Sequence, residues 1–279
     1  MFNPKEIIIE SFIKELQLGY QRNFGNLEPS ISSVIAWMGR LALENIANSD
    51  ALYHNVDHTI MVTLVGQEIL RGKHLKEGGV TPRDWLHFIM ALLCHDIGYV
   101  KGVCRSDEDS EYASGVDDKL VKLPADATDA ALMPYHVDRS KLFVRERFGE
   151  KLLIDLDIEE IVSYIEMTRF PFPDDDAYKD TKSYRGLVRA ADFIGQLGDP
   201  NYIVKIPALF HEFEETEINA KTGYQSPGDM RKNYAKFYWG VVSPYIQDAL
   251  RYLRITMEGN QWIANLHKHV FDVEHTEDQ

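Results

Sequence analysis

The stretch TPRDWLHFIMALLCHDIG, residues 81–98, decides the fold of this chain. Thr81 is a typical helix N-cap residue and Pro82 suits the first helical position, so the sequence predicts that a helix begins here. The apolar residues that follow recur at helical spacing: Trp85, Phe88, Ile89, Leu92 and Leu93. We expect this strongly apolar helix to end at residues 95–98, with Gly98 as its C-terminal stop.

His95 and Asp96 come at the end of that helix. A carboxylate at the buried end of an apolar helix is unfavourable unless it is paired or bound to a metal. The helix C-terminus also carries partial negative charge, which favours a cation nearby. The pair therefore indicates a metal site more strongly than a structural role.

Two further motifs carry groups of the same kind. In YHNVDH, residues 53–58, His54 and His58 are four positions apart and would lie on one face of a helix. Either both reach one metal, or one binds metal while the other transfers protons, or they are ordinary surface histidines. In RAADFIG, residues 189–195, Asp192 interrupts an apolar face. It needs a partner, which is either a metal or Arg189.

Helical periodicity recurs on both sides of these motifs and predicts an all-α fold. We expect helices at 5–18, 31–47, about 57–76, 137–148, 157–168, 183–197, 208–220, 229–256 and 261–271. Pro200 and Pro207 are expected to bracket a turn. Residues 101–133 lack a sustained apolar period and predict a long surface segment with at most a short helix, which is either a lid or simply solvated. Residues 1–279 are expected to form a single domain.

The composition limits the partners. The formal net charge of -14 makes binding to a nucleic acid polymer unfavourable. It permits a small phosphorylated substrate, because bound metals can reverse the local sign of the charge. Cys94 and Cys104 form no disulfide framework, and neither a signal peptide nor a membrane span is indicated, so we expect a cytoplasmic protein. Homo-oligomerisation is left open.

In chain order the motifs read His58, then His95-Asp96, then Asp192. This order resembles the HD superfamily of metal-dependent phosphohydrolases and, more narrowly, the catalytic domains of cyclic-nucleotide phosphodiesterases. YHNVDH matches their Y-H-N-x-x-H motif, ALLCHDIG their H-D motif and RAADFIG their last aspartate, while IEMTRF at 165–170 resembles their threonine-containing segment. The resemblance covers about residues 50–200. It implies an HD-type, phosphodiesterase-like helical bundle, completed by C-terminal helices at 208–271.

The resemblance also implies roles for individual residues. His58, His95, Asp96 and Asp192 would hold the first of two divalent metal ions, and Asp96 would bridge to the second. His54 would be the general acid, and Asn55 would support the histidine pair. Ligands of these types suit Mn, Mg, Fe or Zn and do not select one. Two metals that share a hydroxide would then hydrolyse a phosphodiester of a small nucleotide, such as a 3',5'-cyclic nucleotide.

The chain departs from the family pattern near the second metal. Tyr99, a weak ligand, stands where many relatives have His or Lys. His136 is either a further ligand or phosphate contact, or an exposed histidine before a helix. Arg139 either pairs with phosphate or begins that helix. No base-orienting glutamine is evident, and KFYWG at 236–240 either stacks on a base or packs in the core.

Three alternative functions remain open. A nucleotide phosphomonoesterase would use the same metal ligands. An HD-type di-iron oxygenase would need more histidines at the second metal, for which His136 and His87 are the candidates. A non-catalytic nucleotide-binding signalling module would not need the complete set of His and Asp residues, which argues against that alternative.

Overall fold

A computed structural model describes residues 3–149 and 156–276. Helix makes up 70% of the structure and strand 3%, which confirms the all-α prediction. The first half contains α1 (Pro4–Phe24), α2 (Pro29–Ile46), α3 (Val56–Glu77), α4 (Pro82–Cys94), η1 (Ile97–Tyr99), β1 (Glu111–Ala113), β2 (Leu120–Lys122), η2 (Asp129–Tyr135) and α5 (His136–Phe148). The second half contains α6 (Ile158–Glu166), η3 (Asp176–Lys179), α7 (Tyr184–Leu197), α8 (Tyr202–Glu215), α9 (Ile218–Thr222), α10 (Pro227–Lys232), α11 (Tyr234–Phe237), η4 (Tyr238–Val242), α12 (Ser243–Leu253) and α13 (Met257–Thr276).

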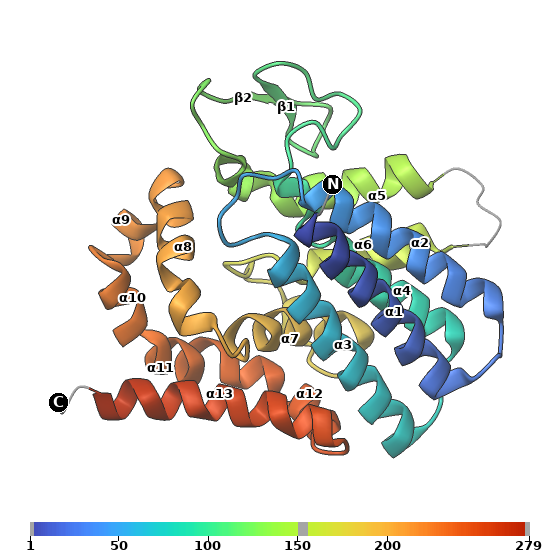
Figure 1. The fold of residues 1–279 in the computed structure, drawn as a ribbon. Helices are drawn as coiled ribbons and strands as arrows, with labels where there is room; N and C mark the ends of the chain where they lie inside the picture. Colours follow the sequence, from blue (N-terminus) through green and yellow to red (C-terminus); the bar gives the residue numbers. More distant parts are fainter. Residues whose placement is uncertain (1–2, 150–155, 277–279) are drawn as a thin grey trace.

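The helices form layers around α3, α4 and α7 (Figure 1). Helices α1 and α2 pack against one another and cover one side of α3 and α4, while α6 packs on α4, and α5 packs on α6 and on the turn η1 that follows α4. Helices α12 and α13 pack on α3 and α7, and α8 to α10 stand at the side of the molecule. One cluster of buried apolar residues extends from α1 to α13. None of the described helices is long and apolar enough to cross a membrane.

Helix α4 is the central buried helix that residues 81–98 predict. Thr81 and Asp84 form a capping box, in which the Thr81 side chain accepts from the Asp84 amide and the Asp84 side chain accepts from the Thr81 amide. The expected C-terminal stop at Gly98 is wrong, because the α-helix ends at Cys94 and a 3-10 turn follows. Gly98 instead permits close packing on α5, since a Cβ there would lie 2.0 Å from the carbonyl oxygen of His136.

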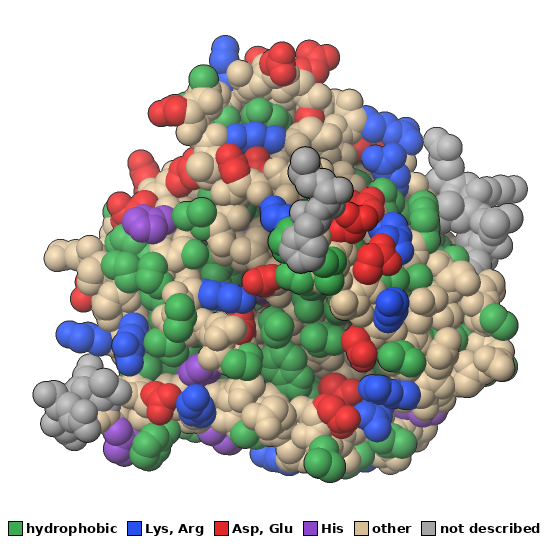
Figure 2. All heavy atoms as spheres, in the orientation of Figure 1, with side chains coloured by type: hydrophobic (Ala, Val, Ile, Leu, Met, Phe, Trp, Pro, Cys, Tyr) green, Lys and Arg blue, Asp and Glu red, His purple; other side chains and the backbone are tan. Residues whose placement is uncertain are grey.

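The segment 101–133 contains a short β-hairpin that the sequence did not predict. Strands β1 and β2 pair antiparallel, with Tyr112 opposite Val121. Gly115, Asp117 and Asp118 all have positive φ in the connection. Acidic side chains gather on this excursion at the top of the molecule (Figure 2).

The C-terminal third also departs from expectation. Pro207 does not border a turn but lies inside α8, which begins at Tyr202. The single helix expected at 229–256 is divided into α10, α11, the π-helical turn η4 and α12. Periodicity alone does not detect such breaks, because the apolar spacing continues through a π-turn that inserts one residue.

Helices α3 and α7 approach closely through Gly195. A Cβ added at Gly195 would lie 2.5 Å from the Cα and 2.8 Å from the backbone nitrogen of Val62. Backbone atoms cannot move aside as a side-chain end can, so the helix separation depends on this glycine. This contact matters for the site because α3 carries His58 and α7 carries Asp192.

Gly195→Ala should therefore force α3 and α7 apart and destabilise the protein by about 1–3 kcal/mol, as overpacked cores do. Urea unfolding would measure the change. Gly240→Ala is the matched control, because a Cβ there meets nothing within 4 Å. Equal stability of the two variants would show that the helix contact does not require Gly195.

Candidate metal centre

The N-terminus of α3 places His58. Asn55 is the N-cap of this helix, and its side-chain oxygen accepts from the backbone amides of Asp57 at 3.0 Å and His58 at 3.3 Å. Its side-chain amide donates to the carbonyl of Leu52 at 2.8 Å, which ties the cap to the preceding loop. His58 therefore leaves the first turn of the helix in a defined direction, and its ring is buried. Asn55 supports the histidine by capping, not by contacting its ring.

The end of α4 places His95 and Asp96. The Nδ1 atom of His95 lies 2.7 Å from the carbonyl oxygen of Leu92. A carbonyl can only accept, so Nδ1 carries a proton, and Nε2 is the ring atom that faces the carboxylates, where it can bind a proton or a metal ion. Such an outer hydrogen bond is typical of metal-binding histidines.

Four side chains converge where α3, α4 and α7 meet. The Nε2 atom of His58 lies 3.1 Å from Asp96 Oδ2 and 3.6 Å from Asp192 Oδ1. The Nε2 atom of His95 lies 3.0 Å and 3.6 Å from the same two oxygens. One ligand atom each from His58, His95 and Asp192 lie within 4.8 Å of one another. The cluster therefore has the composition and spacing to hold a metal ion.

Two unsatisfied polar atoms support this fit. His95 Nε2 and Asp96 Oδ2 are buried and close together, yet neither makes a hydrogen bond of acceptable geometry. A buried polar atom without a partner is unfavourable, and a metal ion would satisfy both atoms. Asp192 does not pair with Arg189, whose guanidinium donates to the carbonyls of Tyr178 and Asp180. This removes the ion-pair explanation for Asp192.

The electrostatics of the cluster favour a cation. Burial alone would raise the pKa of Asp192, but the neighbouring His58 and His95 hold this pKa down, at about 2. Burial alone would lower the pKa of His95, but Asp96 and Asp192 raise it well above its usual value. The two carboxylates thus attract positive charge to this point, as a proton or as a metal ion.

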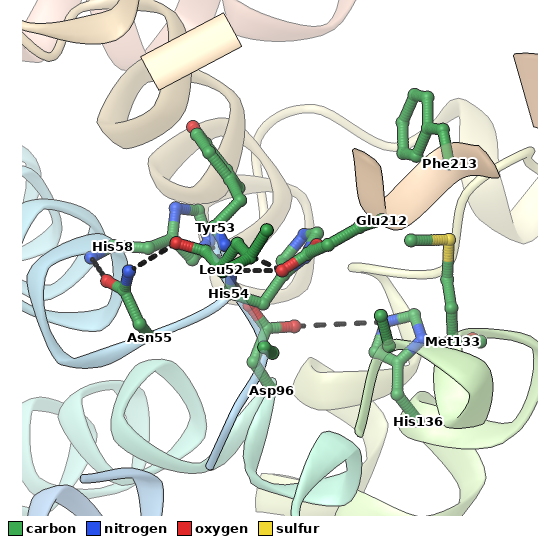
Figure 3. Close-up of polar contacts among 12 residues, drawn as sticks. Leu52, Tyr53, His54, Asn55, His58, Asp96, Met133, His136, Glu212 and Phe213 are labelled. Atoms are coloured by element: carbon green, nitrogen blue, oxygen red, sulfur yellow. Dashed lines mark hydrogen bonds and ion pairs between the residues drawn. The ribbon is translucent and has the colours of Figure 1, made fainter. Parts of the chain in front are cut away.

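Beside this cluster, Glu212 holds His54. The Nδ1 atom of His54 lies 2.5 Å from Glu212 Oε2, and Glu212 Oε1 accepts from the backbone amides of Tyr53 at 2.6 Å and His54 at 3.2 Å (Figure 3). Burial lowers the pKa of His54, but the Glu212 carboxylate outweighs this effect and raises it. Sequence analysis missed Glu212, because it lies in the acidic run HEFEET at 211–216 that is typical of an exposed helix face.

Tyr99 lies between two histidines. Its ring stacks on His54 with centroids 4.4 Å apart and on His136 with centroids 4.6 Å apart. His136 Nδ1 lies 2.5 Å from the carbonyl oxygen of Met133, and its Nε2 lies 3.8 Å from Asp96 Oδ1 (Figure 3). Burial lowers the pKa of His136, which favours the neutral form that can bind a metal. The structure thus brings His136 to the cluster.

The solvent side of the centre can be identified by exposure. The side chains of Asp192, His54 and His136 are 19%, 12% and 14% exposed. Those of His58 and His95 are 4% and 1% exposed. Asp192, His54 and His136 therefore mark the side of the centre that faces solvent.

Comparison with known proteins gives one family. A model of the Npun_R2479-like family matches residues 2–276. The chain belongs to the Npun_R2479-like family. No curated protein and no solved structure matches this Npun_R2479-like chain.

Of the two alternatives for Arg139, a phosphate contact or a residue at a helix start, the structure of this Npun_R2479-like protein supports a structural role. Its guanidinium is fully buried and donates to the carbonyls of Gly98, Val100 and Ala113 and to both carboxylate oxygens of Asp107. With these five hydrogen bonds every N–H of the side chain is used.

His87 also lies outside the centre. Its Nδ1 atom is 2.6 Å from Glu160 Oε2, and its Nε2 accepts from the amide of Asp157 at 3.4 Å. It is a satisfied core histidine between α4 and α6.

The aromatic residues of KFYWG, residues 236–240, lie in different environments. Phe237 packs edge-on against Phe170 and Phe193, Tyr238 is buried, and Trp239 is 54% exposed. The ring contacts of Phe237 support the core explanation for that residue.

Metal binding at the centre should depend on Asp192. Asp192→Asn keeps the shape of the side chain but removes the charge, so tight binding of one divalent ion should be lost. Elemental analysis and the increase in melting temperature on adding Mn or Zn would measure it. Asp57→Asn is the control, an exposed carboxylate near the same helices. Unchanged metal content in Asp192→Asn would contradict the ligand assignment.

Proposed function

We propose that this protein is an HD-type, metal-dependent phosphohydrolase that cleaves a phosphodiester of a small nucleotide, such as a 3',5'-cyclic nucleotide. The observation that carries the proposal is the convergence of His58, His95, Asp96 and Asp192, with unsatisfied atoms on His95 and Asp96. The order of these residues in the chain supports the HD assignment, because His58 on α3, His95-Asp96 directly after α4 and Asp192 on α7 follow the order of the H, H-D and D motifs.

These four residues would hold the first metal ion. A bound divalent ion supplies Lewis acidity and lowers the pKa of water enough to give a nucleophile at neutral pH. Asp96 presents Oδ2 to His58 and His95 and Oδ1 to His136, so its two oxygens face different neighbours. This arrangement supports a second cation position between Asp96 and His136. Tyr99 would not bind this second cation but would stack on the ring of His136 beside it.

His54 is suited to donate a proton to the leaving oxygen. Glu212 engages Nδ1, so Nε2 is left as the atom that can face a substrate. The carboxylate favours the protonated imidazole, and a general acid must be protonated before it acts. The backbone amides of Tyr53 and His54 also donate to Glu212, which fixes the position of the Glu212 carboxylate relative to the His54 ring.

The geometry favours hydrolysis over the di-iron oxygenase alternative. That alternative needs histidines beyond His136 at the second position, and His87 is instead hydrogen-bonded to Glu160 between α4 and α6. A phosphomonoesterase would use the same centre and is distinguished by its substrates.

The purified protein should hydrolyse bis-nitrophenyl phosphate and at least one 3',5'-cyclic nucleotide in a metal-dependent way. Release of nitrophenolate and nucleotide would be measured after chelation and after restoring Mn, Mg, Fe, Zn or Co. Nitrophenyl phosphate is the monoester comparison. Cleavage of monoesters alone would replace the diesterase proposal with the monoesterase, and tightly held iron without any phosphoester turnover would favour the oxygenase. Nucleotide binding without turnover would favour a signalling module.

His54→Gln should keep the metal but lower the rate by about 10²–10⁴ on substrates with poor leaving groups, because the leaving alkoxide loses its proton donor. The loss should be much smaller with nitrophenolate, which leaves without protonation. His267→Gln, an exposed histidine on α13, is the control. An equal loss on both kinds of substrate would contradict the role of His54 as proton donor.

A further inference from the structure

A second pocket lies away from the metal centre. It has a volume of about 210 Å³ and is lined by residues of α1, α3, α4 and α13. None of the four metal ligands lines it. On α3, Gln67 of the pocket comes nine positions after His58, which corresponds to about 13 Å along the helix axis. The pocket therefore needs an explanation of its own.

Gln67 supplies an unsatisfied acceptor in this pocket. The residue is 6% exposed, and its Oε1 atom has no hydrogen-bond partner. The amide lies over Gly19 on α1, where an added Cβ would be 2.1 Å from Oε1. Glycine at this position thus leaves the room that the buried amide occupies. A buried acceptor without a partner is unfavourable, so a ligand that donates an N–H or O–H to Gln67 Oε1 would be stabilised here.

The rim of the pocket carries more negative than positive charge. Glu15, Glu68 and Glu258 line it together with Arg22 and Arg71. Arg71 already contacts Glu68 at 3.5 Å and Glu258 at 3.4 Å. In the part of the chain that the structure describes, the carboxylate of Glu15 forms no ion pair or hydrogen bond. A cation entering the pocket would find a free counter-charge there.

Two indoles complete the lining. Trp85 from α4 and Trp262 from α13 both border the pocket. Indole is the aromatic group that binds cations best, and the attraction grows when water is excluded. The Nε1 atom of Trp85 is buried without a partner, and a water molecule bound beside the ligand would satisfy this donor.

We propose that this pocket is a second ligand site that binds a compact organic cation with several N–H donors, such as an amidine, guanidine or amine. The N–H groups bond to Gln67 Oε1, the charge is balanced by Glu15, and the indoles of Trp85 and Trp262 form the walls. The site does not require the metal centre.

Benzamidine and benzamide test the proposal, because they have the same shape and differ in charge. An engineered cavity of about 150 Å³ holds benzene, so a ring with a small substituent fits the available space. Calorimetric titration of the full chain should show saturable binding of benzamidine, about tenfold or more tighter than benzamide, as expected for charge-assisted hydrogen bonds. Binding should persist with chelator and in Asp192→Asn. Equal affinity for the two compounds, no binding of benzamidine, or loss of binding with chelator would overturn the proposal.

Substitutions of residues that line the pocket test whether benzamidine binds there. Gln67→Leu and Glu15→Gln should each weaken benzamidine binding several-fold, whereas Glu6→Gln, an exposed carboxylate elsewhere on α1, should not. Gly19→Ala serves if Gln67→Leu folds poorly, because its methyl group displaces only the flexible end of Gln67. It should lower the affinity without unfolding the protein. Unchanged affinity in both folded Glu15→Gln and folded Gly19→Ala would place the ligand elsewhere and overturn the assignment.

Discussion

The constraint on which the structure depends is that two carboxylates must share the same pair of imidazoles in a largely buried place. Asp96 and Asp192 both lie within 3.6 Å of the Nε2 atoms of His58 and His95. Like charges this close repel one another, and burial removes the water that would screen them. The site is therefore stable only if positive charge is also present. Three helices must deliver these groups accurately, which explains the cap at Asn55, the bond from His95 to Leu92 and the glycine contact between α3 and α7.

Sequence reasoning succeeded where the signal is local. The capping residues Thr81 and Asp84 mark the start of α4, and apolar periodicity predicts most of the helices within a few residues. It failed where two local signals compete. The alternation of residues 111–113 and 120–122 is too short to outweigh the acidic and turn-forming residues around it, and only the pairing of the two strands makes them a hairpin. Pro207 predicts a boundary, because a proline inside a helix cannot donate the i→i−4 hydrogen bond, yet α8 continues through this residue.

The residues of the candidate site also differ in whether the sequence predicts them. The candidate ligands His58, His95, Asp96 and Asp192 lie in motifs that can each be recognised from the sequence, and the fold brings them together. Glu212 has no such motif and lies 158 residues after His54, so its pairing depends on how α8 docks. Burial is the property that distinguishes Glu212 from its acidic neighbours, and the sequence pattern around it does not indicate burial. Arg139 shows the opposite case, in which a charged residue near a site motif is used entirely within the fold.

The overall charge sets a condition on any anionic substrate. A protein of formal net charge -14 repels a phosphate at long range, and acidic side chains cluster on the hairpin excursion as well. Near the centre, the arginine that the sequence offered as a phosphate contact is buried and fully bonded. Under the proposed function, attraction for a phosphoester would come from cations held by Asp96 and Asp192, together with protonated His54. In the proposed enzyme the carboxylates would have two functions, since they would hold the metal and, through it, reverse the sign of the electrostatic field that the substrate meets.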